Sequence, residues 1–349
     1  MVLGDAGEES YRFLPGLTTT PPYFGGNPVE EQRTRYDPVT ALDPTKTPPA
    51  LLRLSRSSVD LFLQSPRSLW MKWVHDFDDA PSSPKMTLNS STGSLLERAC
   101  DAARAASPPD TLPFLIGTPM EAMRPWVHPN DPGFVQRICG RPGEWRTSQQ
   151  TALPYTKTGE SSPAFQIYGE LDEIFVTTNE DGEEELVIVD FKSKSKAFGT
   201  YRNGARAGQP KIDELLNFKD FAYWYRLQAD FYRWHLRRAL DASGVSTPIH
   251  PVAYFVYVNL DPSEQSNLIV DPAGGRVSFG FDVHVASHTL DDTWVQPTLD
   301  LMVDCLRMTS PPAEQYSSSA TGLPTAHHEW GYGKRYHWLW QNFPATRNY

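Results

Sequence analysis

Two stretches of alternating apolar and polar residues, joined by a short turn, constrain the fold more than any other feature. The first covers residues 165–178 (FQIYGELDEIFVTT) and the second covers residues 185–194 (ELVIVDFKSK), with Asp181 and Gly182 between them. Alternation with a period of two is typical of strands that bury one face, and an Asp-Gly pair favours a tight turn. The sequence therefore predicts a β-hairpin over residues 165–194.

A long helix is predicted after the hairpin. Residues 211–240 contain strong helix formers and an aromatic stripe, and they are bounded by Pro210 and by the DASG sequence that follows. Two more strands are predicted over residues 251–260 and 275–286, and a last helix over residues 291–308. Helices that alternate with strands, the first two of them antiparallel, indicate an α/β fold.

The rest of the chain divides into less regular parts. Residues 1–50 are rich in Pro, Thr and Gly and are predicted to form an extended arm. Residues 51–349 are predicted to form one large domain. Within it we expect two short helical turns broken at Pro66, a helix over 89–106, a loop-rich insertion at about 107–165 with a short strand near 151–156, and a C-terminal extension at about 285–349.

Cysteine usage and hydropathy exclude several classes of protein. The three cysteines are scattered and form no CxxC pair, which excludes a recognisable zinc ribbon and a four-cysteine iron–sulfur site. The first ten residues lack the basic and apolar regions of a signal peptide, and no apolar run approaches the roughly 20 residues that span a membrane. We therefore expect a cytoplasmic protein without a membrane partner.

The charge is unevenly distributed. The whole chain carries a net charge of −10, yet residues 192–238 hold eleven Lys and Arg against four acids. A basic block of this kind could contact the phosphates of DNA, and its predicted contacts are Lys194, Lys196, Arg202, Arg226 and Arg233. A solvated helical face would explain the same residues, and the sequence alone does not separate the two interpretations.

Two acids and a lysine lie near the end of the hairpin. Asp190 and Lys192 are two residues apart on the second strand, so they project from one face, with Phe191 turned to the other. Asp172 lies on the first strand, and pairing could bring it to the same face. Two carboxylates beside an amine form an oxygen-rich site for Mg²⁺ or Mn²⁺ and suit phosphodiester hydrolysis. An exposed hairpin edge is the alternative.

Three other segments accompany the hairpin in a fixed order. They are the opening LSRSSVDLFLQSPRSLWMKW, the stretch GSLLERA with Glu97 where a G-x-x-x-H pattern has His, and QADFY with Gln228 and Tyr232 in a Q-x-x-x-Y pattern. The hairpin itself carries G-x-x-D and (D/E)-x-K motifs. Over about residues 54 to 240 the sequence thus resembles the RecB-like branch of the PD-(D/E)XK nuclease superfamily, which also includes Cas4-type exonucleases.

This resemblance implies a restriction-endonuclease-like core, with a central mixed β-sheet flanked by helices, and Mg²⁺- or Mn²⁺-dependent cleavage of DNA. It implies that Asp172, Asp190 and the Phe191 carbonyl bind the metal, and that Lys192 positions the attacking water. Glu97 would replace the usual His as a further ligand, and an oxygen donor suits Mg²⁺. An exposed helical glutamate is the alternative for Glu97, with Asp101 as a possible substitute ligand.

The resemblance also places Gln228 and Tyr232 beside the catalytic centre. These residues are four apart on the long helix and therefore share one face; for Tyr232 the alternative is an ordinary core residue. Several relatives hold a 4Fe–4S cluster through one early and three late cysteines. This chain has Ser65 before Pro66, and its C-terminal segment TAHHEWGYGKRYHW has no cysteine, so we expect no iron–sulfur cluster.

The chain also lacks a P-loop, so any motor function would come from a separate helicase or recombination partner. Two other functions remain open. One is a catalytically inactive member that keeps the nuclease fold as a DNA-binding or structural subunit. The other is an unrelated α/β enzyme that acts on small phosphorylated molecules, although aromatic and basic residues together suit a polymer strand better.

Overall fold

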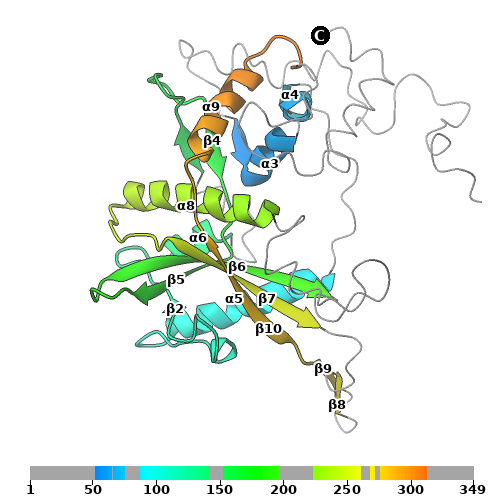
Figure 1. Ribbon diagram of the computed structural model, residues 1–349, viewed down its shortest axis with the longest axis vertical. Coiled ribbons are helices and arrows are strands. Elements are labelled where there is room, and N and C mark those ends of the chain that lie inside the picture. Colours follow the sequence, from blue (N-terminus) through cyan, green and yellow to red (C-terminus); the bar gives the residue numbers. More distant parts are fainter. Residues whose placement is uncertain are drawn as a thin grey trace, which may run out of the picture.

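The computed structural model describes residues 52–64, 66–74, 87–140, 152–195, 223–260, 268–271 and 276–312. These residues form six α-helices, two mixed sheets and a small two-stranded sheet, which confirms the predicted α/β class (Figure 1). The arm predicted over residues 1–50 lies outside the described residues. No helix among the described residues is long and apolar enough to cross a membrane.

The elements follow one another from β1 to α9. The helices are α3 (Arg56–Gln64), α4 (Pro66–Val74), α5 (Thr87–Ala105), α6 (Phe134–Ile138), α8 (Tyr223–Ser243) and α9 (Val295–Leu306). The strands are β1 (Arg53–Ser55), β2 (Arg124–Pro125), β3 (Leu153–Tyr155), β4 (Phe165–Tyr168), β5 (Glu173–Thr178), β6 (Glu184–Ser195), β7 (Val252–Leu260), β8 (Leu268–Asp271), β9 (Arg276–Phe279) and β10 (Asp282–Thr289).

The central sheet has five strands in the order β10-β7-β6-β5-β2. β2, β5 and β6 pair antiparallel, β6 pairs parallel with β7, and β10 closes the other edge antiparallel to β7. Because β6 and β7 are parallel, the chain must cross over between them, and α8 lies within that crossover. The sheet is therefore mixed, as the sequence predicts.

Helices cover both faces of this sheet. Figure 1 shows α8 on one face and α5 on the other. Alternating residues of β6 point to opposite sides: Leu186 and Ile188 pack in the core beneath α8, whereas Val187, Val189 and Phe191 pack in the core beneath α5. The apolar run of β6 is continuous because both of its faces are buried.

The predicted hairpin is present, but its first strand is broken. β5 and β6 pair around a turn in which Gly182 has φ of 82°. β4 joins a separate sheet, however, and the chain leaves it at Gly169 to start β5 at Glu173. A Cβ on Gly169 would lie 3.0 Å from the Tyr232 ring. This close passage over α8 turns the chain out of one sheet and into the other.

A second body of structure surrounds the small sheet β1-β4-β3. β1 runs parallel to β4, and Ser55 pairs with Tyr168. α3 and α4 follow β1 and are separated at Pro66, as predicted, because proline is favoured in the first turn of a helix and cannot continue an earlier one. α9 packs against α3, α4 and α8. The small sheet with α3, α4 and α9 therefore lies on the side of the central sheet that α8 covers (Figure 1).

Three regions differ in detail from the sequence predictions. The region predicted as a loop-rich insertion supplies Leu112, Leu115 and Met120 to the core beneath α5, and it includes the predicted short strand as β3. The strand predicted over 275–286 is two strands, β9 and β10. β10 also belongs to the central sheet, so the region predicted as a C-terminal extension from about residue 285 takes part in the core fold.

Candidate active site

The candidate site lies where β5 stops pairing with β6. The last aligned pair of this ladder is Glu173 with Val189, so Asp172 and Asp190 come one step beyond it. β6 continues beside β7 as far as Ser195. Asp172 therefore lies just before β5 rather than on a strand, which corrects the prediction. The reason is the break at Gly169, which brings this segment toward the sheet at an angle.

The side chain of Asp172 takes the place of the missing strand. Its Oδ2 accepts a hydrogen bond of 2.7 Å from the backbone N–H of Phe191. The N–H and C=O of one strand residue point to the same side. The Phe191 carbonyl therefore faces the edge that β5 has left, beside Asp172. The predicted backbone ligand and the predicted carboxylate are thus brought to one place.

Asp190 and Lys192 project from the α8 face of β6, as strand alternation predicts. The Lys192 ammonium forms an ion pair with Oδ2 of Asp190. Asp190 is only 2% exposed, and neither of its carboxylate oxygens accepts a hydrogen bond of good geometry from the described residues. A buried carboxylate usually has such partners because the unsatisfied group is costly. Asp190 therefore points to a ligand that would complete its coordination.

The electrostatics of the three groups are linked. Burial, and then the neighbouring charge of Asp190, hold the pKa of Asp172 well above its ordinary value, against the opposing effects of Lys192 and the Phe191 N–H. Burial disfavours a charged Lys192, but the carboxylates of Asp190 and Asp172 outweigh it and raise the pKa of that amine. Lys192 is therefore a cation at neutral pH, and the two carboxylates repel each other unless a cation or a proton lies between them.

α8 brings the predicted Gln228 and Tyr232 to this centre. Nζ of Lys192 donates a hydrogen bond of 3.3 Å to Oε1 of Gln228, and Nε2 of Gln228 donates one of 2.9 Å to the Tyr232 hydroxyl. Lys192 also lies 4.5 Å from the centroid of the Tyr225 ring, a cation–π distance. Burial raises the pKa of Tyr232 above its ordinary value, so this phenol stays protonated.

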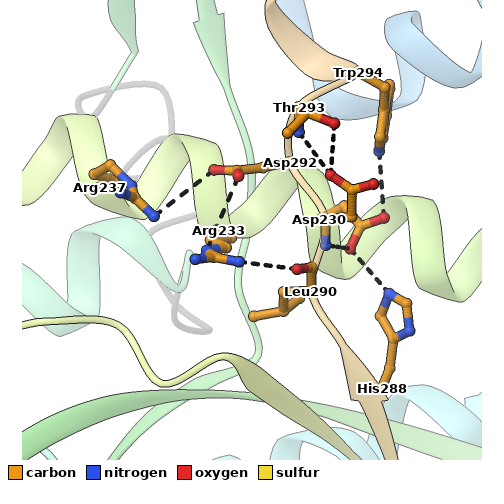
Figure 2. Close-up of polar contacts among 9 residues, drawn as sticks. Asp230, Arg233, Arg237, His288, Leu290, Asp292, Thr293 and Trp294 are labelled. Carbon is orange, nitrogen blue, oxygen red and sulfur yellow. Dashed lines mark hydrogen bonds and ion pairs between the residues drawn. The ribbon is translucent and has the colours of Figure 1, made fainter.

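A separate network on α8 fixes the helix from its other side (Figure 2). Asp230 accepts hydrogen bonds from His288, from the backbone N–H of Asp291 and from the Trp294 indole. Arg233, a predicted DNA contact, donates to the Leu290 carbonyl at 2.9 Å. These bonds tie α8 to the segment between β10 and α9, and they hold the helix in place for Gln228 and Tyr232.

Glu97 comes from the helix on the opposite face of the sheet. Its neighbours Leu96 and Ala99 pack on the core beneath α5, whereas Asp190 projects toward α8. Among the described residues, no three His, Cys, Asp or Glu side chains gather in a way that could hold a metal ion. The alternative ligand Asp101 forms an ion pair with Arg104. The role of Glu97 as a third ligand stays a prediction.

The predicted DNA contacts are only partly described. Lys196 and Arg202 lie outside the described residues, and the structure describes the backbone of Lys194 but not its side chain. Arg226 is half-buried on α8. The basic block as a DNA-binding surface therefore stays a prediction.

Sequence reasoning missed two charged residues on α3 that belong to this centre. Arg56 and Asp60 form an ion pair of 2.9 Å, and the charges of Asp190 and Asp172 also act on Arg56. The sequence of this segment predicts only short helical turns. In the structure α3 begins at Arg56. The carboxylate of Asp60 pairs with the guanidinium of Arg56, which lies one turn earlier on the helix.

The burial of the Asp60 carboxyl group can be tested through the pH dependence of the protein's stability. Burial, partly offset by Arg56, raises its pKa from 3.8 to about 6. The folded protein then binds the proton more tightly than the unfolded chain, so the stabilisation is complete at low pH and is lost as the pH rises from about 4 to 6. Asp60→Asn does not have this pH dependence. The free energy of unfolding of the variant minus that of wild type should therefore rise by about 2 kcal/mol from pH 4 to pH 7. Urea denaturation at both pH values measures it; an equal difference at both would contradict it.

The donor set fits a hard divalent cation. Asp172 and Asp190 offer carboxylate oxygens, and the Phe191 carbonyl faces them. Apart from the ion pair with Lys192, the Asp190 oxygens accept no hydrogen bond of good geometry from the described residues. Mg²⁺ is commonly held by one or two carboxylates, with water and substrate phosphates completing its octahedron. Two carboxylates are therefore enough for such a site, with or without Glu97.

We compared the chain with protein-family models and with curated proteins. No protein-family model matches the chain, and no curated protein matches it at a significant level. What the site does is therefore inferred from its own residues.

Proposed function

We propose that this chain is a metal-dependent DNA nuclease of the PD-(D/E)XK type, exonuclease-like in action, that hydrolyses phosphodiester bonds with Mg²⁺ or Mn²⁺. The observation that carries the proposal is the buried Asp190, which lies beside Asp172, pairs with the Lys192 ammonium and otherwise accepts no hydrogen bond of good geometry from the described residues. A buried pair of carboxylates with an adjacent cation has little structural value, because apolar residues would fill the same space at lower cost.

The order of elements supports the same proposal. Along the chain, α5 comes before the strands β2, β5 and β6 of the central sheet, which pair antiparallel. The helix α8 then leads to β7, which is parallel to β6. A central mixed sheet flanked by helices is what the resemblance to the PD-(D/E)XK nucleases implies. Its two carboxylates lie where β5 and β6 stop pairing.

The chain's own residues account for most of the chemistry. A divalent cation bound by Asp172, Asp190 and the Phe191 carbonyl would supply charge neutralisation at the phosphate and a lower pKa for the attacking water. Lys192 is protonated, so it can stabilise negative charge that develops on the phosphate but cannot accept a proton. Gln228 and the Tyr225 ring hold its ammonium beside the carboxylates, which keeps it in place for the reaction.

The direct test uses end-labelled DNA. Linear and circular substrates, single- and double-stranded, are incubated with the purified protein in Mg²⁺, in Mn²⁺ and in EDTA. We expect degradation of linear DNA that depends on the divalent ion and stops in EDTA, with circular DNA resistant. Absence of cleavage in every condition, by a protein shown to be folded, would refute the nuclease assignment.

One observation favours a second candidate, an inactive nuclease-fold subunit that binds DNA. Within the described part of the chain no third acidic, histidine or cysteine side chain joins the two aspartates. Titration calorimetry with Mg²⁺ separates the candidates. DNA binding without any heat of metal binding at millimolar Mg²⁺ would favour the inactive subunit, whereas metal binding with cleavage would favour the enzyme.

A further inference from the structure

The first residue of α3 is placed beside the candidate site by strand pairing. Arg56 directly follows Ser55, and Ser55 pairs with Tyr168 at the end of β4. From Tyr168 the chain reaches Asp172 in four residues, through Gly169, which passes close to Tyr232. β1 therefore carries Arg56 to the same region as Asp172, although more than 100 residues separate them in the sequence.

The guanidinium of Arg56 interacts with the centre of the site. Although burial acts against its charge, Asp60 and then Tyr232, Asp190 and Asp172 raise its pKa. Its side chain is 22% exposed, so part of it remains open to solvent. Two cations from separate elements, Lys192 on β6 and Arg56 on α3, thus act on one pair of carboxylates.

These two cations are held differently. Lys192 has Asp190, Gln228 and the Tyr225 ring as partners. Arg56 has one ion pair among the described residues, with Oδ2 of Asp60 at 2.9 Å. A guanidinium carries five N–H donors in a planar fork that matches two phosphate oxygens. Asp60 therefore orients the fork and leaves donors for a ligand.

An ordinary helix-surface ion pair would be the simpler explanation. Pairs four residues apart are common on exposed helices and contribute only about 0.3–0.5 kcal/mol. Asp60, however, is buried enough that its pKa rises to about 6 in spite of Arg56. A pair that pays such a desolvation cost beside two further carboxylates is poorly suited to stabilise the helix, and it is well suited to bind an anion.

We propose that Arg56 binds a phosphate of the nucleic-acid strand at the candidate site, and that Asp60 is the residue that positions it. The inference rests on the proposed nuclease function and extends it to a second phosphate-binding cation. Arg56 would bind two non-bridging oxygens of one phosphate through charge-assisted hydrogen bonds, while Lys192 stays with the carboxylates. No bond is made or broken by Arg56.

The test compares Arg56→Ala with Arg53→Ala. Arg53 lies three residues earlier, is exposed and donates to Gln166, so its removal changes the net charge equally but leaves the site intact. We expect Arg56→Ala to slow cleavage of linear DNA in Mg²⁺ by about 100-fold, and Arg53→Ala to leave it unchanged. Asp60→Asn, which frees the guanidinium, should slow cleavage by about 10-fold.

A second readout reports the phosphate contact itself. Fluorescence anisotropy in EDTA measures binding of a labelled oligonucleotide between 50 and 200 mM KCl. Loss of one phosphate contact should reduce the slope of log affinity against log salt concentration by about 0.7–0.9 in Arg56→Ala. Arg56→Lys should keep the slope, because the charge remains, yet cleave more slowly than wild type, because an ammonium lacks the planar fork.

The outcomes separate this inference from the proposed function. Wild-type protein that neither binds nor cleaves DNA overturns the nuclease function and the inference with it. An active wild type with an Arg56→Ala variant of equal rate and equal slope overturns the inference alone. Slower cleavage with an unchanged slope also overturns it, since that result marks a structural role. If Arg56→Ala does not fold, Arg56→Gln, which removes the charge but keeps a polar side chain with an amide donor, is measured by the same criteria.

Discussion

Replacing Asp190 by alanine is expected to lower the Mg²⁺-dependent cleavage of DNA by about 1,000-fold or more, a loss on the order of 4 kcal/mol of transition-state stabilisation. The reason is that Asp190 is a buried carboxylate beside Asp172 and Lys192, so its removal would take a main protein ligand from the metal. Initial rates on end-labelled linear DNA, measured across Mg²⁺ concentrations, give the size of the loss.

Lys192→Ala should lower cleavage to a similar extent, because its ammonium forms an ion pair with Asp190 and is held as a cation by the two carboxylates. Asp181→Asn is the matched control: it removes one carboxylate from the exposed turn of the same hairpin and should leave the rate unchanged. Circular dichroism and thermal melts check that every variant is folded. Wild-type rates in folded Asp190→Ala and Lys192→Ala proteins would show that the chemistry lies elsewhere.

Local periodicity was enough to place Asp190, Phe191 and Lys192 relative to one another. Strand side chains alternate with a fixed period, and the β5–β6 register follows from a turn of defined geometry at Gly182. The same holds for Gln228 and Tyr232, which share a helix face because they are four residues apart. These relations depend only on residues close in sequence.

Other parts of the site depend on contacts between distant segments. The break before Asp172 comes from the passage of Gly169 over Tyr232, and no local pattern signals it. The place of Glu97 depends on which sheet face α5 covers, which a short motif does not determine. Arg56 reaches the site because β1 pairs with β4. A three-residue strand is too short for its sequence to predict that pairing.

A buried ion pair next to the site gives the largest expected effect on stability. Glu173, which is fully buried, forms an ion pair with Arg104, whose side chain is 7% exposed and which also donates to the Trp126 carbonyl at 2.8 Å. Glu173→Ala removes the buried carboxylate from this guanidinium and leaves its ion pair with the half-exposed Asp101. We expect the free energy of unfolding to fall by about 3–5 kcal/mol.

Glu184→Ala is the control for this substitution, because its pair with Arg124 is exposed, at 51% and 40% respectively. A solvated pair of this kind should contribute no more than about 1 kcal/mol. Equal losses in the two variants, measured by urea denaturation, would contradict the proposed cost of removing the buried carboxylate from this guanidinium. A double substitution, Arg104→Met with Glu173→Leu, should recover most of the loss, since it removes both charges together.

The same pair connects stability to the site. Glu173 directly follows Asp172, and its bond to Arg104 fixes the start of β5 against α5. If the pair serves only stability, the double substitution should restore cleavage along with folding. If it also holds Asp172 at the edge of β6, the double variant should be stable but bind Mg²⁺ more weakly than wild type. The second result is expected, because Asp172 reaches the Phe191 N–H from a segment that no strand pairing supports.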